Sequence, residues 1–287
     1  VQPDNPRIVG YTTRNSGGVT SEFKNWFVID FGERNFDYVA VTDGKDIRKG
    51  QTEAREDHSG AIVGFRTKHR DVVTARVASS FISLEQAERN LGELGTKSFD
   101  EVAQAGRKTW NDVLGRIEVQ GGSEEQMRTF YSCLWRSLHF PRRFYELDAQ
   151  GKPVHYSPYN GKVLPGYLFA DTGVWDTFRS LFPFLNLVYP SMNREMQAGL
   201  VNAYLESGYL PEWSSPGHRD CMIGQNSASV WPMPISRVSA WRVRRSCGML
   251  SPTVHTTIWT AAHRVVWATN TMTVWAMCRA TWASGRM

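Results

Sequence analysis

The stretch VVTARVASSFISLEQ at residues 72–86 contains the point at which the chain changes from strand to helix. Ser83 is followed three positions later by Gln86, which fits a capping box: each side chain satisfies a free backbone amide at a helix start. We therefore predict a strand over 72–82 and a helix after Ser83. In the strand, alternate residues share one face, a period of two: Val73, Ala75, Val77, Ser79 and Phe81.

The residues before this stretch indicate further strands. Three segments, 26–31, 36–42 and 61–67, are rich in Val, Ile, Thr and aromatic residues. Because Thr74 and Arg76 point away from the apolar face of the last strand, we expect one face of the sheet to lie in water. This arrangement is typical of a β-sandwich.

The residues after it indicate helices. Ser98 with Glu101 and Ser123 with Gln126 repeat the capping-box spacing. The third helix has an apolar stripe at helical spacing and is ended by Pro141. The stripe consists of Met127, Phe130, Tyr131, Leu134, Trp135 and Leu138.

The second half of the helical region alternates between loops and helices. Residues 141–173 carry many Pro and Gly residues and are predicted to form a long loop, and loops of that length inside a domain are usually functional. A helix interrupted at Pro183 is predicted over about 175–188. Another is predicted over about 193–207, with Gly208 after its last turn. The expected architecture is therefore a sheet domain followed by helical hairpins.

Composition excludes several classes of protein. With 41% hydrophobic residues the chain can build a core, and it has no apolar run long enough to span a membrane. The N-terminus VQPDNPRIVG has neither an initiator Met nor the layout of a signal peptide, so we expect a fragment. Of the four cysteines, only Cys133 and Cys221 precede residue 231, too few for a disulfide framework and without metal-type pairing.

The last 57 residues, 231–287, differ from the rest of the chain. They hold 7 Arg but no Asp, Glu or Lys, together with 6 of the 11 Trp. Charged residues normally make up about a quarter of a soluble chain, with both signs present. Because the segment also has no sustained helical or strand period, we interpret it as an out-of-frame, non-native tail that comes after a frameshift near residue 230. The alternative is a basic, Trp-rich binding segment.

The uneven charge also bears on nucleic-acid binding. The net charge is +5, yet residues 1–230 hold 26 basic and 28 acidic residues. All of the excess positive charge therefore belongs to the tail, and no basic stripe interleaved with aromatic residues exists elsewhere. We predict no nucleic-acid partner.

The loop GYLPEWSSPGHRDCMIGQNSASV at 208–230 is the first candidate site. An aromatic ring beside a carboxylate suits sugar recognition, because the ring stacks on a pyranose and the acid binds hydroxyls. Glu212, flanked by Pro211 and Trp213, would be partly desolvated, which raises its pKa and suits a general acid. The alternative is a surface Glu on a turn with Trp213 as a hydrophobic plug. The other polar members of the loop are His218, Arg219 and Asp220.

The sequence GVWDTFRS at 173–180 is the second candidate site. Asp176 could accept sugar hydroxyls, with Arg179 on the same helical face as its orienting partner. The alternative is that Asp176 caps the helix and Trp175 belongs to the core. His58, His139 and His155 have no second ligand at metal spacing and are expected to be ordinary surface or core residues.

Four segments resemble, in this order, glycoside hydrolase family 92, the bacterial exo-acting α-mannosidases. They are SSFISLEQAERNL, FYSCLWRSLHFPRRFYE, GVWDTFRSLFPFLNLVYP and the loop at 208–230. The resemblance covers about residues 20–230 and implies a partial β-sandwich followed by an incomplete (α/α) helical-hairpin barrel. The implied domains are 1–95 for the sandwich and linker, 96–230 for the first hairpins, and 231–287 for the tail.

The resemblance also implies an activity and a set of site residues. It implies calcium-dependent, inverting removal of terminal α-mannose from glycans by a periplasmic or extracellular parent protein. Glu212 matches the segment of the family's general acid, although many members place a Glu where Ser214 stands. The implied substrate-binding residues are Trp175, Asp176, Arg179, Trp213, His218, Arg219 and Asp220.

The chain departs from the family after this loop. The resemblance implies that the base carboxylates and most calcium ligands come from later helical hairpins. The chain has no Asp or Glu beyond Asp220, so the base is not present in frame and no metal ligand can be assigned. We therefore predict that the chain as it stands is inactive. Two alternatives remain: a non-catalytic carbohydrate-binding fragment, or another glycosidase built on an (α/α) barrel.

Overall fold

A computed structural model describes residues 1–15, 17–219, 221–230 and 278–281. The chain divides into two compact units. The strand unit comprises Val1–Thr12, Lys24–Arg107 and the described part of Thr273–Met287. The helical unit comprises Thr13–Phe23 and the described residues from Lys108 onward as far as 230.

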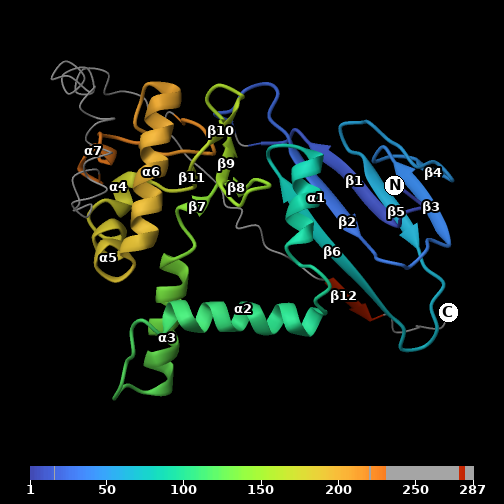
Figure 1. Cartoon of the computed structure of the whole chain (residues 1–287), viewed down its shortest axis with the longest axis horizontal. Helices are drawn as coiled ribbons and strands as arrows, with labels where there is room; N and C mark the ends of the chain where they lie inside the picture. Colours follow the sequence, from blue (N-terminus) through green and yellow to red (C-terminus); the bar gives the residue numbers. More distant parts are fainter. Residues whose placement is uncertain (16, 220, 231–277, 282–287) are drawn as a thin grey trace. The chain divides into compact units, whose positions relative to one another are not determined.

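The strand unit contains two antiparallel sheets (Figure 1). The larger has the order β1-β2-β6-β12, and its strands are Arg7–Thr12, Asn25–Asp30, Val72–Ser80 and Cys278–Thr281. The smaller has the order β4-β3-β5, with strands Ile47–Lys49, Tyr38–Thr42 and Gly60–Gly64. The four predicted strands are confirmed as β2, β3, β5 and β6, whereas β1, β4 and β12 were not predicted.

One expectation about the larger sheet was wrong. The face of β6 that carries Arg76 is covered at its end by helix α1 (Leu84–Gly92) instead of lying in water. Arg76 donates from Nη1 to the carbonyl of Gly95 just after the helix, at 2.7 Å. An apolar cluster between sheet and helix provides the reason, because it removes that surface from water. Its buried members are Val28, Ala78, Ala87, Leu91 and Leu94.

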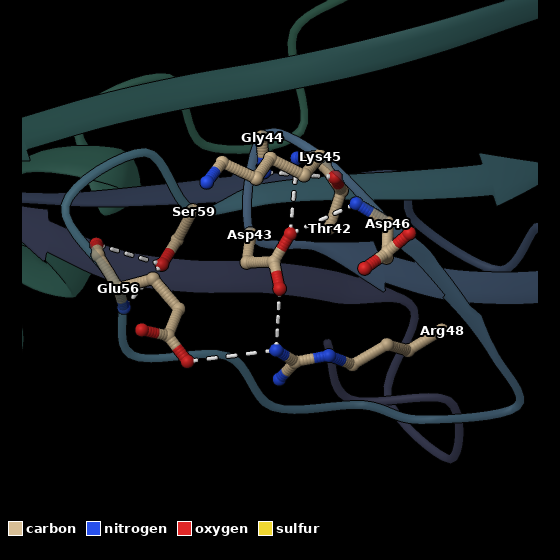
Figure 2. Close-up of polar contacts among 8 residues, drawn as sticks. All are labelled: Thr42, Asp43, Gly44, Lys45, Asp46, Arg48, Glu56 and Ser59. Atoms are coloured by element: carbon tan, nitrogen blue, oxygen red, sulfur yellow. Dashed lines mark hydrogen bonds and ion pairs between the residues drawn. The ribbon is translucent and has the colours of Figure 1, made fainter.

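The hairpin between β3 and β4 is fixed by a single carboxylate (Figure 2). Oδ1 of Asp43 accepts from the amides of Lys45 at 3.0 Å and Asp46 at 2.9 Å, and Oδ2 binds Arg48 at 2.6 Å. The amide of Asp46, then that of Lys45, contribute most to lowering the pKa of Asp43 to about 2. The turn is therefore stabilised by hydrogen bonds between residues that are close together in the sequence.

Each of the three predicted capping serines accepts a hydrogen bond from the amide three residues later. Ser83 accepts from the amide of Gln86 at the start of α1, and Ser98 exchanges bonds with Glu101 before α2 (Phe99–Leu114). Ser123 and Gln126 form a complete capping box at the start of α3 (Glu124–Ser137). Local side-chain chemistry alone therefore located all three helix starts.

The segment after α3 contains more structure than the predicted loop. It holds five short strands in two sheets, β10-β9-β8 and β11-β7. Each strand spans two to four residues, too short to show an alternating pattern. They are β7 (Arg142–Arg143), β8 (Glu146–Leu147), β9 (Pro153–Tyr156), β10 (Val163–Pro165) and β11 (Phe169–Ala170).

Four helices come next: α4 (Val174–Thr177), α5 (Leu181–Val188), α6 (Pro190–Ser207) and α7 (Ser227–Val230). The interruption expected at Pro183 lies earlier, between α4 and α5, because a proline is tolerated in the first turn of a helix. Gly208 ends α6 in the left-handed conformation, with φ 82°. The core of this region is formed by Leu134, Val174, Phe182, Leu185, Tyr189, Met196 and Val230.

Two predictions fall largely outside the described residues. Of the segment 231–287, only β12 is described, paired antiparallel to β6, so the interpretation of a non-native tail stays a prediction. Asp220 also lies outside the described residues.

None of the described helices combines the length and the apolar character needed to cross a membrane. The mixed sheet-then-helix order is confirmed, and closure into an (α/α) barrel stays a prediction.

Candidate functional site

Two segments of the helical unit lie side by side at the candidate site. The amide of Asp171 donates to the carbonyl of Ser214 at 3.0 Å, and the amide of Val174 donates to the carbonyl of Glu212 at 2.9 Å. Between them, Gly173 forms a bridge with Trp213. The two stretches singled out from the sequence, 173–180 and 208–230, are thus brought together by backbone hydrogen bonds.

Glu212 is buried, with 2% of its surface exposed, and both carboxylate oxygens accept hydrogen bonds. Oε1 accepts from the amide of Ser227 at 2.7 Å and from its hydroxyl at 2.5 Å, and Oε2 accepts from Nδ2 of Asn226 at 3.1 Å. Burial raises the pKa of Glu212, and these bonds offset only part of the rise. Glu212 therefore meets the predicted electrostatic condition for an acid, and it also ties the loop to residues 226–227.

Trp213 and Asp176 meet at Gly173. A Cβ atom placed on Gly173 would lie 2.7 Å from the ring of Trp213 and 3.1 Å from Oδ2 of Asp176. A side chain at this position would collide with the ring of Trp213, so the close approach of the two segments requires glycine. Trp213 is 7% exposed, whereas Asp176 is exposed and available to a ligand.

Trp175 and Arg179 interact with each other. The guanidinium of Arg179 lies 4.9 Å from the ring centroid of Trp175, a cation–π contact, and 5.1 Å from that of Phe178. Among the described residues Arg179 forms no ion pair with Asp176, contrary to the predicted orienting role. Trp175 is 45% exposed, which also excludes the alternative that it belongs to the core.

Asp176 does not cap a helix. The N-cap of α4 is Gly173, which supplies no side-chain hydrogen bond, and Asp176 is the third residue of the helix. The capping alternative is therefore not observed. An exposed carboxylate beside an exposed tryptophan is the arrangement expected of a sugar-binding surface.

His218 and Arg219 lie within the loop and contact its own framework. Nε2 of His218 is 2.7 Å from Oγ of Ser207, and its ring lies 4.7 Å from that of Tyr159. Arg219 donates to Oγ of Ser215 at 3.4 Å. His218 therefore contacts the last residue of α6, whereas Arg219 contacts a serine within the loop itself.

A short N-terminal segment, residues 13–23, packs against the same loop. A Cβ atom on Gly217 would overlap the carbonyl oxygen of Gly18, so the two backbones touch. The hydroxyls of Thr20 and Tyr156 lie 2.6 Å apart, and Phe23 contacts the ring of Tyr156. This segment lies between strands β1 and β2 in sequence, yet it belongs to the helical unit.

The buried ion pair between Arg142 and Asp171 was not predicted. Nε and Nη2 of Arg142 bind Oδ2 of Asp171 at 2.7 and 2.5 Å. Burial raises the pKa of Asp171 to about 7 and lowers that of Arg142 to about 10. The partners are far apart in sequence, and neither residue stands in a recognisable motif.

His155 is a core residue, one of the two predicted alternatives. It is fully buried, with Nδ1 2.9 Å from the carbonyl of Gly166 and Nε2 2.8 Å from Oε1 of Glu206. Both ring nitrogens therefore lie within hydrogen-bonding distance of an oxygen. This contact links β9 to the last turn of α6, on which the site loop depends.

The described residues do not provide a calcium site. Among them, no group of three or more His, Cys, Asp or Glu side chains is placed to hold a metal ion. Ca²⁺ takes six to eight oxygen ligands, several of them carboxylates. The donor set present therefore does not fit the ion that the resemblance implies.

The chain matches two models of known protein domains. Residues 1–80 match the glycosyl hydrolase family 92 N-terminal domain, and residues 86–244 match the glycosyl hydrolase family 92 catalytic domain. Both models describe glycoside hydrolases. The chain belongs to glycosyl hydrolase family 92.

Solved structures of mannosidases are similar to the chain. The family GH92 inverting mannosidase BT2199 from Bacteroides thetaiotaomicron VPI-5482 is 43% identical, with a TM-score of 0.78 over 80% of this chain and 31% of that one. The α-mannosidase BT3965 of Bacteroides thetaiotaomicron, solved with mannoimidazole, is 22% identical, with a TM-score of 0.66 over 85% of this chain and 34% of that one. The second likeness shows the fold alone.

The chain spans about a third of the length of these structures, 31% and 34% respectively. A comparison with curated protein sequences found no match.

Proposed function

We propose that this chain is part of an enzyme that removes terminal α-mannose from glycans by inverting hydrolysis. Family membership and the 43% identity to a structure described as an inverting mannosidase support the substrate and the stereochemistry. The observation that carries the proposal is the pairing of residues 171–174 with 212–214, which brings the segment that holds the exposed Trp175 and Asp176 next to the buried Glu212.

The residues of the site have distinct roles in this proposal. Asp176 accepts hydroxyl hydrogens of the sugar, and the exposed part of Trp175 contacts its apolar face. Glu212, whose pKa is raised by burial, holds a proton for the leaving oxygen. We assign that proton to Oε2, which accepts one hydrogen bond, from Asn226, whereas Oε1 accepts two from Ser227.

Inverting hydrolysis also needs a base on the other side of the sugar, with the two carboxyl groups about 6.5–9.5 Å apart so that water fits between them. The sequence offers no carboxylate after Asp220. We therefore propose that this chain binds α-mannosides without turning them over. For the intact parent we extend the proposal to a calcium ion, with ligands from outside this chain, and to a periplasmic or extracellular location.

The test compares this chain with a parent protein whose reading frame is restored after codon 230. The parent is expected to release β-mannose from α-1,2-mannobiose, and a chelator should abolish the release. The chain alone should bind methyl α-mannoside but release nothing. Release of α-mannose, or no release by the parent, would contradict the proposal.

A matched pair of variants locates the binding. Asp176→Asn should weaken binding of methyl α-mannoside by this chain, because a good hydroxyl acceptor is lost. Asp100→Asn removes an exposed carboxylate from the first turn of α2, outside the two site segments, and should leave binding unchanged. Equal effects of the two substitutions would show that Asp176 has no specific role.

A further inference from the structure

The buried ion pair of Arg142 and Asp171 lies at the beginning of one site segment. Asp171 is the first residue of that segment to bond to the other, through its amide and the carbonyl of Ser214. Three residues later, Val174 bonds to the carbonyl of Glu212. The backbone conformation of Asp171 therefore determines the direction that the chain takes through residues 172–176.

The backbone of Asp171 is in an uncommon conformation. Its φ is 68°, in the left-handed region that non-glycine residues rarely adopt. Such conformations persist only where the surrounding structure imposes them. Here the side chain is held by two nitrogens of Arg142 on strand β7, and the preceding residue, Ala170, is the register partner of Arg142.

Stability alone does not explain this pair. The side chains of Arg142 and Asp171 are 5% and 1% exposed. Nη1 of Arg142 and Oδ1 of Asp171 are buried without a hydrogen-bond partner among the described residues. A partly satisfied buried ion pair is often no more stable than an apolar pair of similar volume. A role in fixing one particular backbone geometry would explain why an ion pair, and not an apolar pair, occupies these two positions.

We propose that Arg142 and Asp171 are positioning residues, which hold the turn at 171 so that Trp175 and Asp176 are presented to the sugar beside Glu212. The part of this inference that concerns the sugar rests on the proposed function. The part that concerns the backbone stands by itself and can be tested without a ligand.

The test measures amide hydrogen exchange in the full chain, residue by residue. The reporting amides are those of Asp171 and Val174, which cross between the segments, and Gly208, which bonds within α6, is the internal control. The variants are Arg142→Met, which removes the charge, and Arg142→Lys, which keeps it. Arg116→Met is the control variant, because Arg116 bonds to the carbonyl of Val188 and lies outside the site.

In Arg142→Met, exchange at Asp171 and Val174 should rise by about tenfold or more, with little change at Gly208, because the remaining carboxylate is buried without its partner. Arg142→Lys should restore part of the protection, since an ammonium can bind Oδ2 but cannot present two donors in a fork. Arg116→Met should leave the two reporting amides unchanged. Equal acceleration of all three amides, or of none, would overturn the proposal.

A second variant covers the case in which Arg142→Met does not fold. In Asp171→Gly the residue can adopt the left-handed conformation without a steric cost, but the carboxylate is absent. Val174 should still lose protection, and wild-type protection there would show that the turn alone suffices and that the pair is not needed.

The sugar arm uses methyl α-mannoside as the probe. In each variant that loses protection of the Val174 amide against exchange, the dissociation constant of methyl α-mannoside should rise about tenfold, because Asp176 is then misplaced relative to the sugar. Faster exchange with unchanged sugar affinity would overturn the role in presenting the sugar. If even the wild-type chain binds no sugar while the exchange effect is present, the proposed function fails and the positioning of the backbone stands.

Discussion

Replacing Glu212 gives the sharpest test of how the site loop is held. In Glu212→Ala three donors lose their acceptor: the amide and hydroxyl of Ser227 and Nδ2 of Asn226. The hydroxyl can rotate to another acceptor and Nδ2 also contacts the carbonyl of Ile223, so the amide of Ser227 suffers most. At about 1–3 kcal/mol for each donor left unsatisfied, the free energy of unfolding should fall by about 2–4 kcal/mol.

Glu212→Gln should cost less, about 1 kcal/mol at acid pH, because its carbonyl oxygen still accepts from Ser227. The difference between the two variants therefore measures the hydrogen bonds, and the pH dependence of the difference between wild type and Glu212→Gln measures the effect of burial on the carboxyl. The pKa of Glu212 is raised above 4.5 in the folded state, so the folded chain binds more protons than the unfolded chain. Wild-type stability from this group is greatest below pH 4.5 and declines as pH rises through the folded pKa.

Because glutamine does not titrate, the deficit of Glu212→Gln relative to wild type should shrink from pH 4 to pH 8. Urea unfolding followed by far-UV circular dichroism at several pH values measures it, provided that the m-values of the two proteins agree. A deficit that grows with pH would refute the reasoning, since it would mean that the three hydrogen bonds outweigh burial and that the folded pKa is lowered.

Three further predictions concern elements away from the carboxyl of Glu212. Gly106→Ala in α2, where an added Cβ meets nothing within 4 Å, should raise the free energy of unfolding by about 0.5–1 kcal/mol, whereas Gly217→Ala, whose Cβ would overlap backbone, should lower it in the same urea assay. Ser123→Ala removes the capping hydroxyl of α3 and should cost about 1 kcal/mol, with Ser123→Thr as the control that keeps it. The Asp43 carboxyl should titrate near pH 2 by NMR, so its stabilising contribution to the hairpin is complete above the unfolded pKa of 3.8 and is lost as pH falls toward 2. Arg48→Met should raise the pKa of Asp43 only slightly, because the backbone amides of Asp46 and Lys45 lower it most. A rise to 3.8 in this variant would contradict that ranking.

The secondary structure could be predicted where local chemistry determines it. Ser83, Ser98 and Ser123 each mark a helix start through bonds to a residue three positions away, and the strand over 72–82 repeats its apolar residues at every second position. In contrast, β7 and β11 are two residues long and are formed by pairing with each other. No local pattern can reveal a strand whose cause lies elsewhere in the chain.

The same distinction applies to the site. Glu212 and Trp213 could be predicted as candidate site residues because they are neighbours in a Pro- and Gly-rich loop. Arg179 was assigned to Asp176 by helical spacing, which gives proximity but cannot rank an exposed carboxylate against the face of Trp175. Arg142 and Asp171 were missed because a buried ion pair between two isolated positions has no sequence signature.

The contact between Gly18 and Gly217 limits how this protein can be taken apart or recombined. Residues 13–23 are encoded among the strands, yet they complete the packing around Tyr156 and the loop at 217–218. A chimera that exchanges the sheets of two relatives at a boundary near residue 95 would therefore also exchange part of the wall that supports the site. A working chimera therefore needs residues 13–23 from the same parent as the helices, although their codons lie among those of the strands.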